Sequence, residues 1–128
     1  MNDSNLSITK TIKGKIPHLP FIDMKESILG KKYELSLVFI GDKRAKTLNE
    51  TYRKKDYIPD ILSFPYDTHE GEIFINPLQA KRRAKDFDMS PKKFMGFLFI
   101  HGLLHLKGLH HGSTMDKLEH AHLKRYSI

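Results

Sequence analysis

The sequence contains no cysteine and no tryptophan among its 128 residues. The absence of cysteine excludes disulfides and thiolate metal sites. Acidic residues are also in the minority: 22 Lys and Arg stand against 15 Asp and Glu, which gives a formal net charge of +7. Such a charge favours a polyanionic partner such as RNA, DNA or a ribosome surface, and the alternative is a basic surface that serves only solubility.

Long hydrophobic runs are missing as well, because no apolar stretch approaches the ~20 residues of a membrane span. The first residues, Met1–Asn5, lack the basic and then apolar pattern of a signal peptide. We therefore expect no membrane partner, and the lack of cysteine fits a cytoplasmic location. The length of 128 residues and the 39% hydrophobic content predict a single domain, 1–128, with one buried core.

The most informative stretch is 101–111, where three histidines follow the pattern H-x-x-x-H-x-x-G-x-x-H. His101 and His105 are four residues apart, so on a helix both imidazoles project from one face. Gly108 can take a left-handed conformation that ends the helix, after which His111 can turn back to the same point. Three imidazoles with a fourth position open are typical of catalytic zinc, whereas structural zinc sites are usually closed by four protein ligands.

The residues around this motif predict a buried helix, since 94–106 are apolar apart from two histidines and two glycines. Burying an imidazole without a partner costs about 1–3 kcal/mol. The histidines are then either core residues bonded to backbone carbonyls or ligands of one zinc ion per chain, and the repeated spacing favours zinc. His110 is an alternative third ligand, although the spacing favours His111. Three imidazoles also accept nickel or copper.

The rest of the chain predicts an α+β fold: a small mixed β-sheet of about four strands with packed helices, and a metal site on a buried central helix and the turn after it. We expect strands at 5–12 (an edge strand), 34–40, 61–64 and 72–75, with Pro65 ending the third. We expect helices at 20–29, 43–53, 78–87, 91–107 and 114–125. Asp42 is the expected cap of the second helix, which directs Ala45, Leu48 and Tyr52 to the core, and Ser90 is the expected cap of the fourth.

Three further segments become informative when they are considered together with the histidine motif. Residues 48–53 are Leu-Asn-Glu-Thr-Tyr-Arg, residues 60–65 are Asp-Ile-Leu-Ser-Phe-Pro, and Gly-Glu-Ile follows at 71–73. Together with 101–111 they resemble the YbeY family, the single-strand-specific endoribonucleases of ribosomal RNA maturation, over about residues 35–111. The chain departs from that family at Leu109-His110, where the family has Tyr-Asp, and at Ile58-Pro59, where it usually has Pro-Thr.

The resemblance implies a metal-dependent phosphodiester hydrolase that cuts single-stranded RNA in ribosomal RNA maturation and ribosome quality control, with ribosomal or assembly proteins as partners. It also implies that Arg53 is the catalytic arginine facing the metal. A guanidinium can hold a phosphodiester with two hydrogen bonds and stabilise developing charge. Without the resemblance, Arg53 is one of six basic residues between Lys43 and Lys55 that are simply solvated. Candidates to guide the RNA backbone are Lys43, Lys54, Lys55, Arg82 and Arg83.

Two other functions fit parts of the pattern. The histidine spacing is that of metzincin proteases, but these need a glutamate as general base directly after the first histidine, where this chain has Gly102. A non-catalytic RNA- or ribosome-binding protein fits the basic charge equally well, and no general base is evident in the sequence. Asp116 and His120 form an i, i+4 pair that is either an exposed surface pair or a weak candidate for a partner of the metal ligands.

Overall fold

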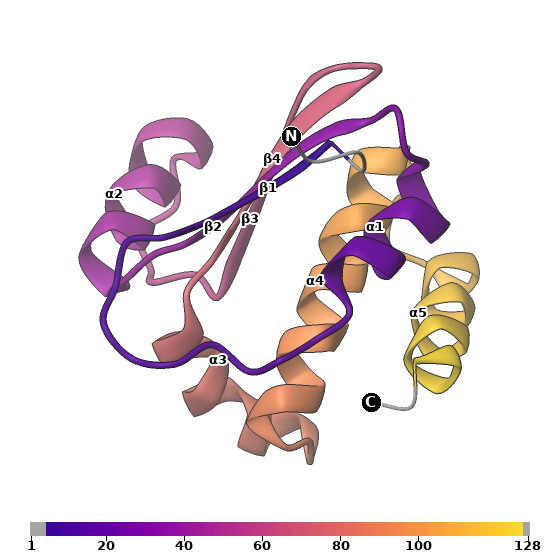
Figure 1. The fold of residues 1–128 in the computed structure, drawn as a ribbon. Coiled ribbons are helices and arrows are strands. Elements are labelled where there is room, and N and C mark those ends of the chain that lie inside the picture. Colours follow the sequence, from indigo (N-terminus) through magenta and orange to yellow (C-terminus); the bar gives the residue numbers. More distant parts are fainter. Residues whose placement is uncertain (1–4, 127–128) are drawn as a thin grey trace.

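The computed structural model describes residues 5–126, which form a four-stranded sheet with helices on both faces (Figure 1). The strands lie in the order β1-β2-β4-β3. Their bounds are Leu6–Lys10 for β1, Glu34–Phe39 for β2, Ile61–Asp67 for β3 and Glu70–Ile75 for β4. β2 runs parallel to β1 and β4, whereas β3 is antiparallel to β4. The predicted α+β class with a mixed sheet is confirmed, and the first strand lies at the sheet edge as expected.

The helices divide unequally between the two faces of the sheet. One face is covered by α2 (Asp42–Arg53) alone, while α1 (Phe21–Leu29), α4 (Pro91–Lys107) and α5 (Ser113–Arg125) lie on the other (Figure 1). A shorter helix, α3 (Pro77–Ala84), continues into a 3₁₀ turn, η1 (Lys85–Phe87), at the lower end of the sheet. The larger core therefore lies between the sheet and α4.

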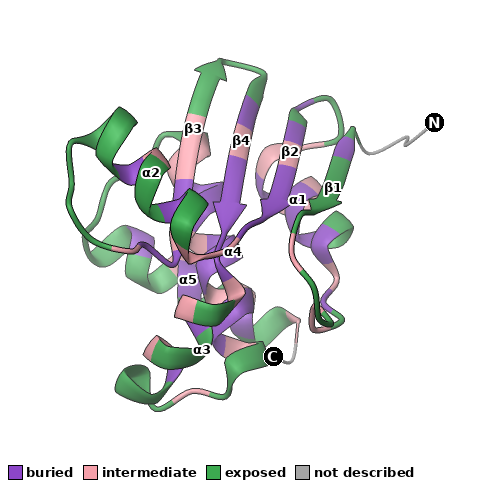
Figure 2. Ribbon diagram, turned by 90° about the vertical axis from the view of Figure 1, so that its left-hand side faces the viewer, coloured by how far each residue is buried: buried purple, intermediate pink, exposed green. Residues whose placement is uncertain are grey.

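Strand β2 contributes apolar side chains to both faces of the sheet, because both faces are covered. Leu35, Leu37 and Phe39 belong to the core shared with α1 and α4, while Val38 packs with Ala45 of α2 on the opposite side. Figure 2 shows that β4 and most of β2 are buried, whereas β1 and the end of β3 are largely exposed. The alternation of side chains along a strand thus supplies two separate apolar layers.

Helix α4 is central to the fold, and its ends are fixed by local sequence. The Ser90 hydroxyl accepts a hydrogen bond from the Lys93 amide at 3.1 Å, and Pro91 occupies the first turn. The helix stops at Gly108, whose φ of 108° favours glycine. The predicted cap at Ser90 and the predicted stop at Gly108 are both confirmed.

Three local predictions were wrong. The third strand passes through Pro65 to Asp67, which an edge strand tolerates because the missing amide hydrogen need not cost a ladder hydrogen bond. The cap of α2 is Gly41, since the Asp42 carboxylate instead accepts hydrogen bonds from Asn76 and Arg82. Tyr52 is 67% exposed, and its ring packs against Phe64 at the rim of the smaller core.

Buried Asn76 joins three segments that position the lower half of the structure. Its side-chain oxygen accepts from the Gln79 amide at the start of α3, at 3.4 Å. Its Nδ2 donates to Asp42 at 2.8 Å and to the Pro59 carbonyl at 3.4 Å. The Asp42 carboxylate accepts hydrogen bonds from Arg82 and Asn76. These bonds lower the pKa of the carboxyl group, and the bond from Arg82 has the larger effect. Asn76 therefore ties the start of α2 and the 54–60 loop to the start of α3.

Replacing Asn76 tests this junction. Asn76→Ala should lower the free energy of unfolding by about 1–3 kcal/mol, because a helix cap and two buried hydrogen bonds are lost. Asn76→Asp keeps the cap acceptor but brings a second carboxylate against Asp42, which raises the pKa values of the pair. As pH rises from 3 to 6, the Asn76→Asp variant should lose stability relative to wild type, because two neighbouring carboxyl groups become charged. In the wild type, the lowered pKa of Asp42 contributes stability that is lost as pH falls. Urea unfolding at several pH values measures both, and equal pH slopes would contradict this account.

Candidate metal centre

Three histidines converge at the C-terminal end of α4. Nε2 of His101 and Nε2 of His105 are 3.1 Å apart, and His111 completes a group whose possible ligand atoms all lie within 4.8 Å of one another. The three imidazole rings are 4.6–4.9 Å apart by their centroids. His110 is exposed and does not belong to this group. The structure thus brings together the three histidines predicted from the spacing, which could hold a metal ion.

The backbone explains how the third histidine reaches the first two. The amide of Gly108 donates to the carbonyls of Leu104 and His105, which closes the last turn of α4. The amide of Leu109 then donates to the Leu104 carbonyl at 3.1 Å, so the chain folds back under the helix. His111 follows two residues later and lies beside the helix end. A residue other than glycine at 108 would be strained, because its φ is 108°.

The ring nitrogens of His101 and His105 are spaced like two ligands of one metal ion. Two nitrogens on a tetrahedral zinc are about 3.3 Å apart for Zn–N bonds of about 2.05 Å, close to the 3.1 Å observed here between His101 and His105. Burial first, and then the nearby His101 and His111, lower the pKa of His105. His105 therefore favours the neutral form, which is the form that binds a metal.

A buried carboxylate orients the first histidine of the group. Nδ1 of His101 donates to Oε2 of Glu119 in α5 at 2.5 Å, and Glu119 is only 4% exposed. This contact fixes the ring so that Nε2 faces His105 and His111, an arrangement common in zinc sites. The ring of His105 also forms a hydrogen bond with the Leu109 backbone. Both helical histidines are therefore held by a second partner.

Sequence reasoning missed Glu119, although a signal was present. Met115, Glu119 and Leu123 are four residues apart and all buried, so an acidic residue interrupts the apolar stripe of α5. Asp116, the weak candidate from the sequence, lines the same cleft as the histidines. His120 does not line the cleft. Its Nδ1 contacts the Asp116 carbonyl at 2.7 Å on the exposed side of the helix.

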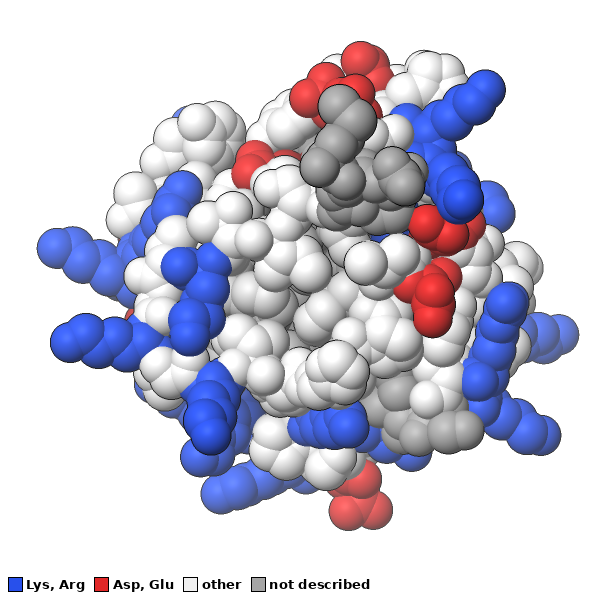
Figure 3. Space-filling view, viewed as in Figure 1, with Lys and Arg blue, Asp and Glu red and all other residues white. Residues whose placement is uncertain are grey.

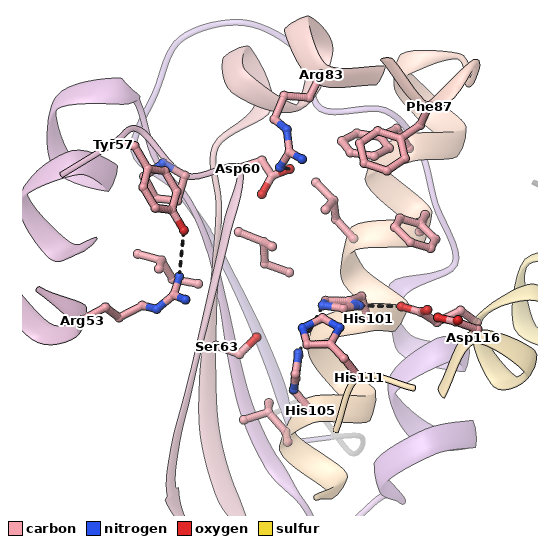
Figure 4. A pocket seen from close by; sticks show the side chains of 18 of the residues that line it. Arg53, Tyr57, Asp60, Ser63, Arg83, Phe87, His101, His105, His111 and Asp116 are labelled. Carbon is pink, nitrogen blue, oxygen red and sulfur yellow. Dashed lines mark hydrogen bonds and ion pairs between the residues drawn. The ribbon is translucent and has the colours of Figure 1, made fainter. Parts of the chain in front are cut away.

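The histidines lie at one wall of a cleft of about 680 Å³ between α4 and strand β3 (Figure 4). Arg53 and Tyr57 come from the opposite side, at the end of α2 and in the loop after it. Figure 4 shows the Arg53 guanidinium directed across the cleft toward the histidines. It lies within 3.4 Å of the Asn49 side-chain oxygen and 3.5 Å of the Tyr57 hydroxyl. The arginine predicted from a distant segment thus faces the candidate metal centre.

The predicted guiding residues divide into two groups. Arg83 lines the cleft, where its Nη1 donates to buried Asp60 at 2.5 Å. Arg82 pairs with Asp42 outside the cleft, and its Nη2 donates at 2.9 Å. Lys43, Lys54 and Lys55 are on α2 or just after it, at the surface, and do not line the cleft. Of these five side chains, Arg83 alone is placed to meet a molecule inside the cleft.

Gly102, which follows the first histidine, faces the sheet. A Cβ at this position would lie 2.9 Å from the Ile61 side chain and 3.0 Å from those of Ser63 and Ile73. The helix and sheet approach so closely here that a larger residue would require rearrangement. A glutamate base, as a metzincin protease needs, has no room at this place.

Basic side chains project from several margins of the molecule. Figure 3 shows Lys and Arg projecting from the left, lower and right margins of the face that carries β1, with Asp and Glu at its top, at its right centre and at its bottom. The left margin corresponds to α2 in the same view. Within residues 5–126, the structure has no helix that is both long enough and apolar enough to cross a bilayer.

Comparison with known proteins identifies relatives. The family model described as Endoribonuclease YbeY matches residues 2–127. The Endoribonuclease YbeY of Mycoplasma mycoides subsp. mycoides is 40% identical over 95 residues, which cover 66% of this chain and 58% of that protein. The Endoribonuclease YbeY of Lacticaseibacillus paracasei is 31% identical over 106 residues, which cover 73% of this chain and 70% of that protein.

The fold is shared with a solved structure as well. The solution structure of a Thermotoga maritima protein superposes with a TM-score of 0.67 at 24% identity, over 94% of this chain and 88% of that one. The chain spans less than two thirds of the length of the mycoplasma relatives that it matches, 58% in each case. The family model nevertheless matches nearly every residue, so the chain belongs to the YbeY endoribonuclease family.

Proposed function

We propose that this protein is a zinc-dependent endoribonuclease that cuts single-stranded RNA. The observation that supports this most is the placement of three converging imidazoles opposite a guanidinium in one cleft (Figure 4). The net charge of +7 suits a polyanionic substrate. The relatives named Endoribonuclease YbeY support the same reaction class.

His101, His105 and His111 would hold the zinc ion, since three nitrogen ligands leave a fourth position for water or substrate. When bound, zinc supplies a Lewis acid that polarises a phosphoryl oxygen and makes a water acidic enough to attack near neutral pH. Arg53 would hold the phosphodiester with two hydrogen bonds and stabilise the charge that develops on its oxygens. The Asn49 and Tyr57 contacts orient this guanidinium before the substrate arrives.

The sequence showed no candidate for the proton acceptor. We propose that the Asp116 side chain has this role. Three carboxylates line the cleft. Asp60 pairs with Arg83 and Glu119 with His101, whereas the Asp116 carboxylate enters no ion pair within the part of the chain that the structure describes. The aspartate that the family has directly before the third histidine is absent here, because exposed His110 occupies that position. A carboxylate from α5 can therefore take the role of the carboxylate that the 109–111 turn lacks.

We extend the proposal to ribosomal RNA as substrate, in ribosome maturation and quality control in the cytoplasm, with ribosomal or assembly proteins as partners. Its support is the family membership. Cells that lack the protein should then accumulate ribosomal RNA with unprocessed ends, which mapping of RNA termini would measure. A protein that binds RNA but does not cut it when loaded with zinc would instead be a non-catalytic assembly factor. Gly102 argues against a protease, so no cleavage of casein is expected.

His105→Ala should reduce the bound zinc from about one ion per chain to almost none and abolish RNA cleavage, because one of three ligands is removed. His110→Ala is the matched control, since its imidazole lies outside the ligand group, and it should keep both zinc and activity. Metal analysis of the purified proteins and a gel assay with labelled RNA measure the two effects. Removing the metal with a chelator should stop wild-type cleavage. If His105→Ala retains zinc and activity, the proposal is wrong.

Arg53→Ala should lower the cleavage rate by about 10²–10³-fold without reducing zinc content, because it removes charge stabilisation at the phosphodiester but no ligand. Arg53→Lys should recover little, since an ammonium cannot form the paired hydrogen bonds of a guanidinium. Lys46→Ala removes an exposed charge from the same helix, away from the cleft, and should change the rate by less than Arg53→Ala does. Equal losses for Lys46 and Arg53 would mean that Arg53 contributes only general charge.

The two carboxylates of α5 should behave differently. Glu119→Gln weakens the hold on His101 and should reduce zinc affinity by about 10–100-fold. Asp116→Asn should leave zinc affinity unchanged and lower the cleavage rate by about 10²-fold or more, because a proton acceptor is lost. Zinc titration against a chelating dye and single-turnover cleavage with zinc in excess separate the effects. An Asp116→Asn protein that cuts as fast as wild type would remove Asp116 from the mechanism.

A further inference from the structure

The cleft has an aromatic wall that the proposed cleavage chemistry does not use. It consists of Phe87 at the end of η1 and of Phe94 and Phe97 on α4. The rings of Phe87 and Phe94 are stacked, with centroids 4.9 Å apart and planes 28° apart. Those of Phe94 and Phe97 are 6.0 Å apart at 23°. Three rings of similar orientation therefore lie next to one another along the cleft.

This wall leads directly to the metal centre. The ring of Phe97 is 6.1 Å from the ring of His101, and the two planes differ by 30°. Phe97 and His101 are one helical turn apart on α4, so they line the same side of the cleft. A group that rests on the phenylalanines would lie beside a phosphate held near the histidines and Arg53.

Core packing explains only part of the wall. Phe94 is 1% exposed and packs with Ala80, Ala84 and Leu98, which is an ordinary core environment. Phe97 is partly buried at the edge of this cluster. Phe87, in contrast, is 44% exposed although its ring borders the cleft. Phe94 and Arg83 both pack against this ring, and the part of it that stays exposed at the mouth of the cleft is the part that a ligand can reach.

The wall also has a positive charge at its outer end. The Arg83 guanidinium carbon lies 5.4 Å from the centroid of Phe87, over the ring. Its Nη1 donates to Asp60, which is only 5% exposed and so holds the guanidinium in place. Figure 4 shows Arg83, Asp60 and Phe87 around the upper end of the cleft, with the histidines below. Guanidinium planes and aromatic rings are the groups on which unpaired bases stack.

We propose that Phe87 and Phe97, with Arg83 at their outer end, form a stacking site for one unpaired base next to the scissile phosphodiester. The inference rests on the proposed function and adds the part of the substrate that is recognised. The volume of about 680 Å³ is within the range of about 300–1,000 Å³ that holds a small organic ligand. A duplex cannot offer the face of a base to such a wall, so the site selects unpaired RNA. Since every base has a π-face, the site tolerates different sequences.

The test uses the full chain and RNA decamers that carry 2-aminopurine at successive positions, because stacking quenches the fluorescence of this base. With the wild-type protein, fluorescence should fall severalfold at one position, adjacent to the cut that is mapped separately. Phe87→Leu keeps an apolar side chain without the ring, and it should abolish the quenching and raise the Kd by about tenfold. Phe87→Trp restores a ring and should restore both.

Tyr52→Leu is the matched control, because it removes another exposed ring that does not line the cleft. It should leave quenching and Kd as in wild type, and thermal unfolding by circular dichroism should show all variants folded. The inference is overturned if no position is quenched, if Phe87→Leu binds like wild type, or if Phe87→Trp fails to restore what Phe87→Leu loses.

The binding experiment is run with zinc and again after chelation, which keeps this inference separate from the proposed cleavage. RNA that is stacked at Phe87 in both states but cut in neither supports the stacking site and overturns the endoribonuclease proposal. RNA that is cut at normal rate by Phe87→Leu and never quenched in wild type supports the endoribonuclease proposal and overturns the stacking site.

Discussion

The contact between His101 and Glu119 joins the fold to the candidate metal centre. Helix α4 is buried between the sheet, α1 and α5, so an imidazole on it needs a partner for each of its two nitrogens. Glu119 of α5 satisfies Nδ1 at 2.5 Å, which leaves Nε2 for His105, His111 and a metal ion. Because the carboxylate comes from a different helix, the packing of α5 on α4 determines whether the His101 ring faces the other two histidines.

The cleft follows from the way the sheet meets α4. Gly102 allows the helix to approach Ile61 and Ser63 of β3 closely, and beyond this point the two elements leave an open space lined from both sides. One wall carries the histidines and the phenylalanines, and Arg53 faces them from the end of α2 (Figure 4). The proposed metal ligands and the proposed base contact thus share one wall of the cleft, and the proposed phosphate contact faces them from the other.

Several features of the fold follow from local sequence alone. Ser90 and Pro91 start α4, and Gly108 ends it in a conformation that other residues rarely adopt. The alternation in β2 places Leu35, Leu37 and Phe39 on one face, as the period of a strand requires. These predictions hold because each depends on residues within one or two turns. The prediction that Tyr52 faces the core was wrong, because its ring lies over Phe64 at the edge of the sheet and is 67% exposed. The position of that edge under α2 cannot be read from local sequence.

The sequence by itself determined the candidate metal centre more fully than any other part. The spacing of His101, His105 and His111 around Gly108 is a local geometric code, because one helical turn and one left-handed glycine bring the three rings together. The tertiary structure alone decided the partners of that centre. Glu119, Asp116 and Phe87 come from segments whose distance along the chain says nothing about their distance in space. Only the packing of α5 and η1 around α4 brings them to one cleft.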